Sequence, residues 1–177
     1  MTLILAGMAL AQPVPSSLEP QSQRQVAIMP QFDPDALAAR VRQSQETFTA
    51  LVAAQPRYTY TEQFSSWAGF GHTVNVIVDS GRVVEHGFRS YNQDRNVEQD
   101  WVERGDTLNT HGRPFPMTME KHYERCLEVL SNLDPTRYAV YLSFFDNGVL
   151  AHCSYRELMC IDDCSQGTML GSFSFIP

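Results

Sequence analysis

Four cysteines in the C-terminal third of the chain limit the folds open to this sequence more than any other feature. They are Cys126, Cys153, Cys160 and Cys164. An even number of cysteines predicts two disulfide bonds if the chain reaches an oxidising compartment. A structural zinc site is the alternative, but the spacings of 26, 6 and 3 intervening residues match no common zinc finger or ribbon. We therefore expect two disulfides and no metal.

The first residues of the chain predict export. Residues 3–6 are apolar, and Ala9-Leu10-Ala11 places small residues at the two positions that a signal peptidase recognises. We expect residues 1–11 to be a signal peptide, with an apolar tail or short helix as the alternative. The apolar run is shorter than the roughly 20 residues that span a bilayer, and no later segment is longer. We expect a secreted or extracytoplasmic protein without a membrane span.

The next segment, residues 12–31, is polar and contains four prolines, so we expect a flexible leader. Residues 32–177 then form a single domain of ordinary size. Of the 177 residues, 43% are hydrophobic, which is enough for a core.

The charge of the chain argues against nucleic acid as a partner. The formal net charge is −7, and the thirteen lysines and arginines form no cluster along the sequence. A protein that binds a phosphate backbone concentrates positive charge on one surface. The acidic balance mainly favours solubility.

The hydrophobic pattern of the first half predicts one helix and three strands. Asp33-Pro34-Asp35 is a typical helix start, and apolar residues recur at helical spacing until about residue 54. Residues 57–64, 72–78 and 82–88 are rich in β-formers, with a turn at residues 79–81. The segment 92–116 is long, polar and carries glycines and prolines, so we expect a loop in which function could reside.

The second half repeats this order. A helix is expected from about residue 118 to residue 133, and strands at residues 138–145, 149–155 and 169–176. Asn147-Gly148 predicts a type I′ hairpin turn between the first two of these strands. The fold class is therefore α+β: an antiparallel β-sheet of about five to six strands with two helices on one face, in the order α-βββ-α-βββ.

The strand pattern favours one pairing of the cysteines. Val149, Ala151 and Cys153 share a face of their strand, and that face meets the helix carrying Cys126 if it is turned toward the helices. A Cys126–Cys153 bond would then link helix to sheet and leave Cys160–Cys164 as a local clip. The two other pairings stay open.

No catalytic residue and no cofactor is predicted. The sequence has no Gly-x-Ser-x-Gly elbow, phosphate loop or dinucleotide fingerprint, and its five histidines form no zinc-hydrolase motif. His122 and Cys126 lie one helical turn apart, but we expect Cys126 to be oxidised rather than nucleophilic. A hydrolase whose acids and histidines meet only in space is the alternative. Asp162 and Asp163 are weak calcium candidates, because no Asp-x-Asp-x-Asp-Gly loop surrounds them.

A binding surface, if one exists, is expected in the two long loops of the first half. The candidate binding residues there are Trp67, Phe70, Trp101, His111 and Phe115. Large aromatic side chains are costly to leave in water, so our favoured interpretation is that the loop aromatics fold back on the core. An exposed patch for a partner or ligand is the alternative.

Several short motifs occur along the folded part of the chain: Tyr58-x-Tyr60, Val74-x-Val76, Asp79-x-Gly81-x-Val83-Val84, Thr118-Met119-Glu120, Phe145-Asp146-x-Gly148 and Asp162-Asp163. In this order they resemble an uncharacterised family of small exported α+β domains from bacteria and algae, whose function is unassigned. The resemblance covers residues 32–176 and implies the fold and an extracytoplasmic location. The family often carries cysteines where this chain has Ser65-Ser66-Trp67, and the resemblance implies no catalytic residues.

These features together favour a secreted, disulfide-stabilised, non-enzymatic binding module whose ligand is an unknown protein or small molecule. An extracellular hydrolase with a spatially assembled site is the first alternative, and a calcium-stabilised structural domain is the second.

Overall fold

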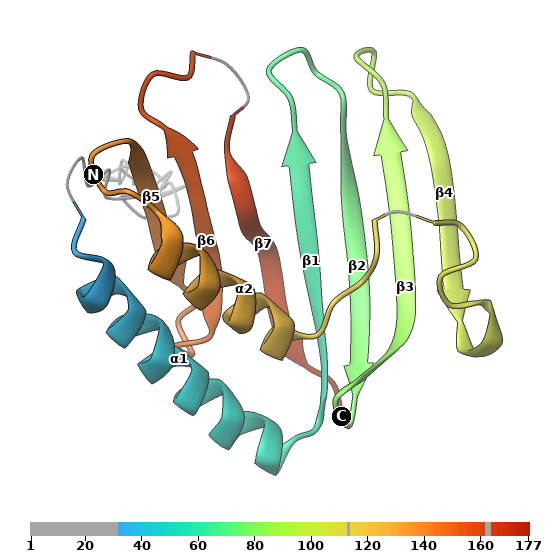
Figure 1. Cartoon of the computed structure of the whole chain (residues 1–177). Helices are drawn as coiled ribbons and strands as arrows, with labels where there is room; N and C mark the ends of the chain where they lie inside the picture. Colours follow the sequence, from blue (N-terminus) through green and yellow to red (C-terminus); the bar gives the residue numbers. More distant parts are fainter. Residues whose placement is uncertain (1–31, 113, 162–163) are drawn as a thin grey trace, which may run out of the picture.

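The computed structural model describes residues 32–112, 114–161 and 164–177. The expected signal peptide and leader lie outside these residues, as do the calcium candidates Asp162 and Asp163. Within them, the chain forms two α-helices, one short 3-10 helix and a single antiparallel sheet of seven strands (Figure 1). None of the helices in this described part is long and apolar enough to cross a membrane.

The elements follow one another in a simple order along the chain. They are α1 (Pro34–Ala54), β1 (Arg57–Ser65), β2 (Gly71–Asp79), β3 (Arg82–Tyr91), β4 (Val97–Arg104), η1 (Gly105–Thr107), α2 (Met119–Asn132), β5 (Tyr138–Phe144), β6 (Leu150–Glu157) and β7 (Gln166–Phe175). The strand order across the sheet is β4-β3-β2-β1-β7-β6-β5. Strand β1 therefore joins the two halves, because it pairs with β2 on one side and with β7 on the other.

Helix α1 begins and ends where the sequence predicts. The Asp33 side chain accepts hydrogen bonds from the backbone N–H groups of Asp35 and Ala36, and Pro34 occupies the first helical turn. The helix ends at Ala54, two residues before Pro56. Its buried side chains lie on one face, which packs against the rest of the core.

Both helices pack on the same face of the sheet, as predicted. The ring of Phe48 in α1 lies 5.5 Å from that of Tyr58 in β1, 5.6 Å from Tyr123 in α2 and 6.2 Å from Phe173 in β7. The backbone N–H of Met119 donates to the Tyr58 hydroxyl oxygen at 3.0 Å. Aromatic packing and hydrogen bonds thus fix α1 and α2 to the centre of the sheet.

The prediction of a loop over residues 92–116 is wrong in part. Residues 97–104 form β4, which pairs with β3 at the edge of the sheet, so the sheet has seven strands and the order is α-ββββ-α-βββ. The sequence Val-Glu-Gln-Asp-Trp-Val-Glu-Arg lacks a run of β-formers because most of this edge strand faces water. Cross-strand contacts hold it instead, including an ion pair between Arg89 and Asp100.

The type I′ turn forms in a hairpin other than the one predicted. Ser80 and Gly81, between β2 and β3, have φ angles of 50° and 74°, which a two-residue type I′ loop requires. In the β5–β6 hairpin only Gly148 has a positive φ, of 82°. Asn147 instead accepts the backbone N–H of Val149 through its side chain at 3.1 Å, so its contribution is a side-chain turn rather than a left-handed backbone.

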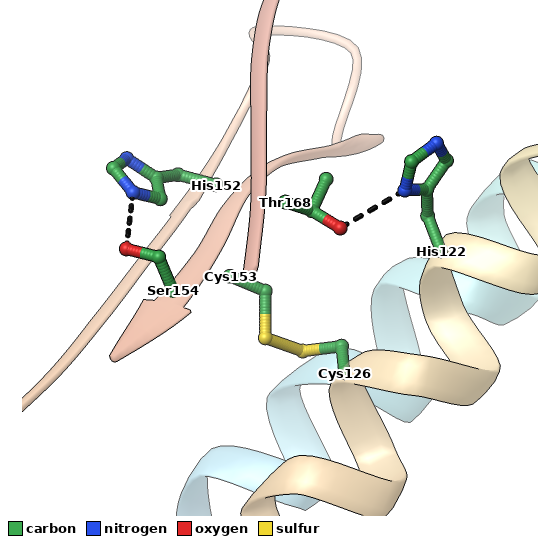
Figure 2. Close-up of a disulfide and its surroundings, with 6 residues drawn as sticks. All are labelled: His122, Cys126, His152, Cys153, Ser154 and Thr168. Atoms are coloured by element: carbon green, nitrogen blue, oxygen red, sulfur yellow. Dashed lines mark hydrogen bonds between the residues drawn. A yellow bond between two sulfur atoms is a disulfide. The ribbon is translucent and has the colours of Figure 1, made fainter. Parts of the chain in front are cut away.

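The cysteines form the favoured pairs. Cys126 of α2 is bonded to Cys153 of β6 with their Cα atoms 5.9 Å apart (Figure 2). Cys160 is bonded to Cys164. The first bond links a helix to the sheet, and the second closes a short loop between β6 and β7.

Candidate functional site

Six aromatic rings form a continuous row across strands β1 to β4. In spatial order they are Phe70, Phe64, His72, Phe88, Trp101 and His111. Successive ring centroids lie between 4.6 Å (Trp101–His111) and 6.1 Å (Phe64–Phe70) apart. We call this set the aromatic row.

Strand register places these rings on one face. Phe64 stands opposite His72 in the β1–β2 pair, and Phe88 stands opposite Trp101 in the β3–β4 pair. His72 bridges the two pairs, because its ring lies 5.4 Å from that of Phe88. Side chains alternate between the faces of a strand, so Phe64 and with it the row lie on the same face as buried Tyr60, four residues earlier in β1. The row therefore occupies the face of the sheet on which the helices pack.

The two helices do not cover the aromatic row. They pack over β6 and β7, whereas the described part of the connection from η1 to α2 runs in front of β2–β4 (Figure 1). Both ends of the row meet solvent: Phe70 is 43% exposed and the side chain of His111 is 51% exposed. A ligand can therefore reach aromatic surface without any rearrangement of the core.

A hollow of about 390 Å³ lies at the Phe70 end of the row, between the β1–β2 and β3–β4 loops. Its aromatic lining includes Phe64, Phe70 and His72, and its polar lining includes Ser90, Asn92 and Glu98. This volume falls within the range of small-molecule sites, and apolar walls with a few polar groups are typical of them. We call this cavity the hollow.

The wall of the hollow depends on a glycine. A β-carbon at Gly71 would collide with the carbonyl oxygen of Phe64 and would lie 2.6 Å from the hydroxyl oxygen of Tyr91. The missing side chain lets the Tyr91 ring lie against the β2 backbone. The Arg95 guanidinium lies over this ring, 5.0 Å from its centroid.

Two glutamates bring negative charge to the hollow, beside the Arg95 guanidinium on Tyr91. Glu98 lies in its lining, and Glu62 is close enough to His72 to affect its titration. Burial lowers the pKa of His72, and the Glu62 carboxylate opposes this effect only in part. The His72 imidazole is therefore neutral at pH 7, and the two glutamates dominate the charge at this end of the row.

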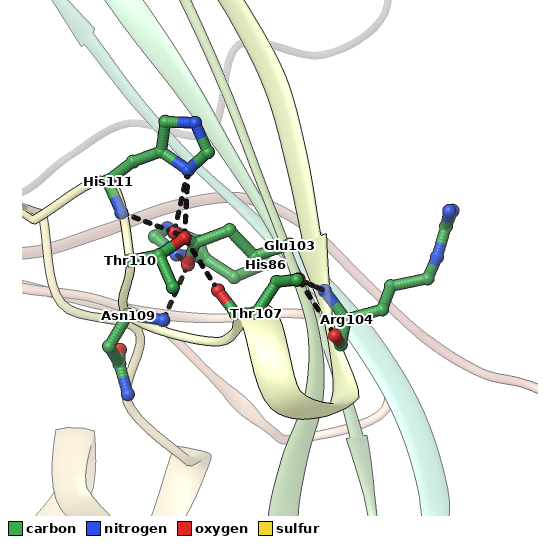
Figure 3. Close-up of polar contacts among 7 residues, drawn as sticks. All are labelled: His86, Glu103, Arg104, Thr107, Asn109, Thr110 and His111. Atoms are coloured by element: carbon green, nitrogen blue, oxygen red, sulfur yellow. Dashed lines mark hydrogen bonds and ion pairs between the residues drawn. The ribbon is translucent and has the colours of Figure 1, made fainter.

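At the other end of the row, a buried carboxylate holds the loop that carries His111 (Figure 3). The Glu103 side chain is 1% exposed and accepts the backbone N–H groups of Asn109 at 2.7 Å and His111 at 2.6 Å. The His111 Nδ1 atom lies 2.9 Å from it and the Thr110 hydroxyl 3.0 Å. Burial raises the pKa of Glu103, but these hydrogen bonds outweigh burial and lower the pKa to about 2.

His86 lies beneath this cluster as an uncharged ring. Its side chain is fully buried, its Nδ1 atom is 3.5 Å from Glu103, and neither ring nitrogen has a hydrogen-bond partner among the described residues. Burial lowers the pKa of His86, and the neighbouring Glu103 only partly offsets it. The ring centroids of His86 and Trp101 are 5.0 Å apart and the rings are nearly perpendicular. His86 and Glu103 thus support Trp101 from the side of the core.

A second histidine stands in line with a hydroxyl and a carboxylate. His122 Nδ1 lies 2.9 Å from the Thr168 hydroxyl, and Nε2 lies 3.1 Å from Glu62 (Figure 2 shows the Thr168 contact). Hydroxyl, imidazole and carboxylate in this order are the components of nucleophilic acyl transfer. However, Thr168 is 6% exposed and adjoins a cavity of about 70 Å³, the space of only two or three waters. The arrangement ties α2 to β1 and β7, and the adjoining cavity is smaller than an ordinary small-molecule site.

The structure brings together three of the five candidate binding residues. Phe70, Trp101 and His111 belong to the aromatic row. Trp67 in the β1–β2 loop is 79% exposed, and Phe115 before α2 is 57% exposed. The favoured expectation that the loop aromatics cap the core is therefore wrong for Trp67 and Phe115.

Three rings that connect the row are not among the candidate binding residues. Phe64, His72 and Phe88 lie in segments predicted to be strands. Period-two alternation in residues 60–64 and 72–78 was a usable signal. It did not suffice, because the contact between β3 and Trp101 exists only if residues 97–104 are a strand.

Among the residues that the structure describes, no group of three histidine, cysteine or acidic side chains is placed to hold a metal ion. Asp162 and Asp163 lie outside those residues.

Comparisons with known proteins leave the site as the main guide to function. No protein-family model, no curated protein and no solved structure matches the chain.

Proposed function

We propose that this protein is a secreted, disulfide-stabilised binding module whose ligand occupies the hollow at the Phe70 end of the aromatic row. The observation that carries the proposal is an open row of six rings leading into a cavity of about 390 Å³. Aromatic side chains that stay accessible on a rigid sheet offer contact area at little entropic cost.

The chemistry of the lining favours binding over catalysis. The hollow contains one neutral histidine and one glutamate at its rim, without a nucleophile and base in contact. The groups fixed most firmly near the row, Glu103 and His86, are buried and face inward. They stabilise the surface and do not reach a ligand.

Export remains part of the proposal. Two disulfides are compatible with an oxidising compartment, and residues 1–11 carry the features of a signal peptide. The resemblance to exported α+β domains supports the same location.

A ligand screen tests the proposed site. The protein beginning at residue 12 is expressed with its disulfides formed and mixed with a library of small metabolites, and bound compounds are detected by saturation-transfer NMR. We expect hits whose signal is lost in Phe70→Ser, which removes one wall of the hollow. The control is Val102→Ser, because Val102 is also exposed but lies on the opposite face of the sheet from Trp101. Hits that bind equally to both variants, or no hits at all, would contradict the proposal.

An esterase or related acyl-transfer enzyme is the second candidate function, favoured only by the alignment of Thr168, His122 and Glu62. Activated p-nitrophenyl esters test it directly. Turnover that disappears in both Thr168→Val and His122→Gln would support this function. Turnover that persists in Thr168→Val would exclude the threonine as nucleophile.

A further inference from the structure

We infer that the ligand of the hollow is a small organic cation, such as an ammonium or quaternary ammonium group carried on a short apolar chain. This inference rests on the proposed function and names the chemical class of its ligand.

The first argument is the aromatic lining. Phe64, Phe70 and Tyr91 line one cavity, together with the neutral imidazole of His72, and the rings of Phe64 and Phe70 lie 6.1 Å apart. The face of an aromatic ring carries partial negative charge and attracts a cation within about 6 Å of its centroid. Several rings around one space are the arrangement that recognises quaternary ammonium groups.

The second argument is that this loop already pairs a cation with a ring. Arg95 lies over the ring of Tyr91 at 5.0 Å, although its backbone has the unfavourable positive φ of 64°. The Asn92 side chain holds that turn by accepting the backbone N–H groups of Asp94 and Asn96, each at 3.0 Å. The turn thus holds one cation–π contact on a residue that lines the hollow, and leaves the rings of Phe64 and Phe70 for a ligand.

The third argument is charge. Glu98 lines the hollow, Glu62 lies near His72, and the chain as a whole carries −7. Arg89 is paired with Asp100, whereas Arg95 keeps its charge where it lies over the ring of Tyr91. The Glu98 carboxylate in the lining would repel an anionic ligand and attract a cationic one.

Paired probes of equal shape test the inference. Choline, tetramethylammonium and butylammonium are titrated into the full disulfide-bonded protein, and choline is compared with 3,3-dimethylbutan-1-ol, its uncharged carbon analogue. Binding is followed by isothermal calorimetry and by shifts of the amide signals of Gly71, Ser90 and Glu98. We expect choline to bind about 3- to 30-fold more tightly than the neutral analogue, the range that cation–π contacts provide.

Two variants separate the sources of this preference. Glu98→Gln keeps the size of the side chain and removes its charge, and Phe70→Leu keeps an apolar wall and removes a ring face. Each is expected to weaken choline by about threefold or more, with little effect on the neutral analogue. Glu128→Gln on the exposed face of α2 is the matched control and leaves both affinities unchanged.

The outcomes separate this inference from the proposed function. Equal affinities for choline and its neutral analogue, or binding of a neutral sugar but of no cation, would overturn the cationic class and leave the hollow as a ligand site. If none of the three cations shifts the amides of the hollow, the cationic class is also overturned. The metabolite screen then decides separately whether the hollow binds any ligand.

Discussion

Gly71 stands where the β2 backbone, the Phe64 carbonyl and the Tyr91 ring meet. Its φ is not in the left-handed region, so its role is to provide space rather than conformational freedom. Any larger residue would push Tyr91 away from the strand or separate β1 from β2. The position therefore links the stability of the sheet to the shape of the hollow.

Replacing Gly71 by alanine is expected to lower the free energy of unfolding by about 1–3 kcal/mol, the usual cost of overpacking. Urea denaturation followed by circular dichroism measures this loss. Gly87→Ala is the matched control: a β-carbon there would lie 3.6 Å from Asn75 and Val102, an ordinary contact distance. Equal losses in both variants would show that the effect comes from strand glycines in general and not from crowding at Gly71.

Glu103 illustrates how one buried side chain orders a loop. Its carboxylate accepts two backbone N–H groups from residues 109 and 111, and His111 then stacks on Trp101 at 4.6 Å. Without the carboxylate, both N–H groups would lose a charged acceptor, which is stronger than a neutral one.

We expect Glu103→Gln to loosen this loop without unfolding the sheet. Amide hydrogen exchange at Asn109 and His111 should accelerate roughly tenfold or more, because each loses a hydrogen bond to a charged group. Exchange in α2 should stay unchanged. Glu124→Gln, an exposed carboxylate on α2, serves as the control. Unchanged exchange at Asn109 and His111 would mean that the loop is held by contacts other than Glu103.

At the scale of elements, local signals predicted the helices and most strands but missed the strand that completes the site. Neighbouring residues alone predict the Asp33 cap and the apolar face of α1. The same holds for the alternation of residues 72–78 that predicts β2. Strand β4 is different, because its eight residues are mostly charged or polar and become a strand only by pairing with β3. An edge strand that is largely exposed to solvent needs few apolar or β-branched residues, so its sequence shows little of the pattern that predicts a strand.

The same limitation explains the partial prediction of the site. Trp101 and His111 could be proposed from a long polar loop, but their contact requires Glu103 to fold the chain back on β4. The pairing of Cys126 with Cys153 was easier to predict than the site. The helical period and the strand period place these two cysteines on surfaces that face each other.

The bond between Cys126 and Cys153 is expected to contribute more to stability than the clip between Cys160 and Cys164. It closes a loop with a sequence separation of 27 residues, whereas the clip spans 4. Chain entropy gives about 3.5 kcal/mol for the longer loop and about 2 kcal/mol for the shorter one. The double variant Cys126→Ala with Cys153→Ala should therefore unfold at lower urea than Cys160→Ala with Cys164→Ala. The reverse order would show that the clip stabilises the native state through contacts beyond its own short loop.

At the scale of the whole molecule, the open aromatic row follows from where the helices lie. Both pack over the β7–β6 side, where Phe48, Tyr123 and the disulfide fix them. Strands β2–β4 extend beyond this layer (Figure 1), and the rings of the aromatic row on them are half-buried. In the described part of the chain, the two helices do not reach across all seven strands, and the end of the row at Phe70 is available for a ligand.

The histidines make the stability of the fold sensitive to acid. Burial lowers the pKa of His72, His86 and His152 below the ordinary value of 6.5, so the unfolded chain binds more protons than the folded one near that pH. Stability is therefore expected to be fully present above pH 6.5 and to fall as the pH drops below it. Glu103 adds a second decline, because its pKa is about 2 in the folded protein and 4.5 without the fold.

Thermal unfolding between pH 7.5 and 3 tests this dependence. We expect the melting temperature to fall by a few degrees or more from pH 7.5 to 5, and to fall again below pH 4.5 as the unfolded form of Glu103 takes up a proton. His86→Leu removes the most buried of the three imidazoles and should flatten the first decline, whereas Glu103→Gln should flatten only the second. His111→Gln is the comparison for the first decline, because His111 is half exposed on the same loop. A melting temperature that stays constant or rises between pH 7.5 and 5 would contradict a neutral, buried His86. It would then also contradict the packing of an uncharged His86 ring against Trp101.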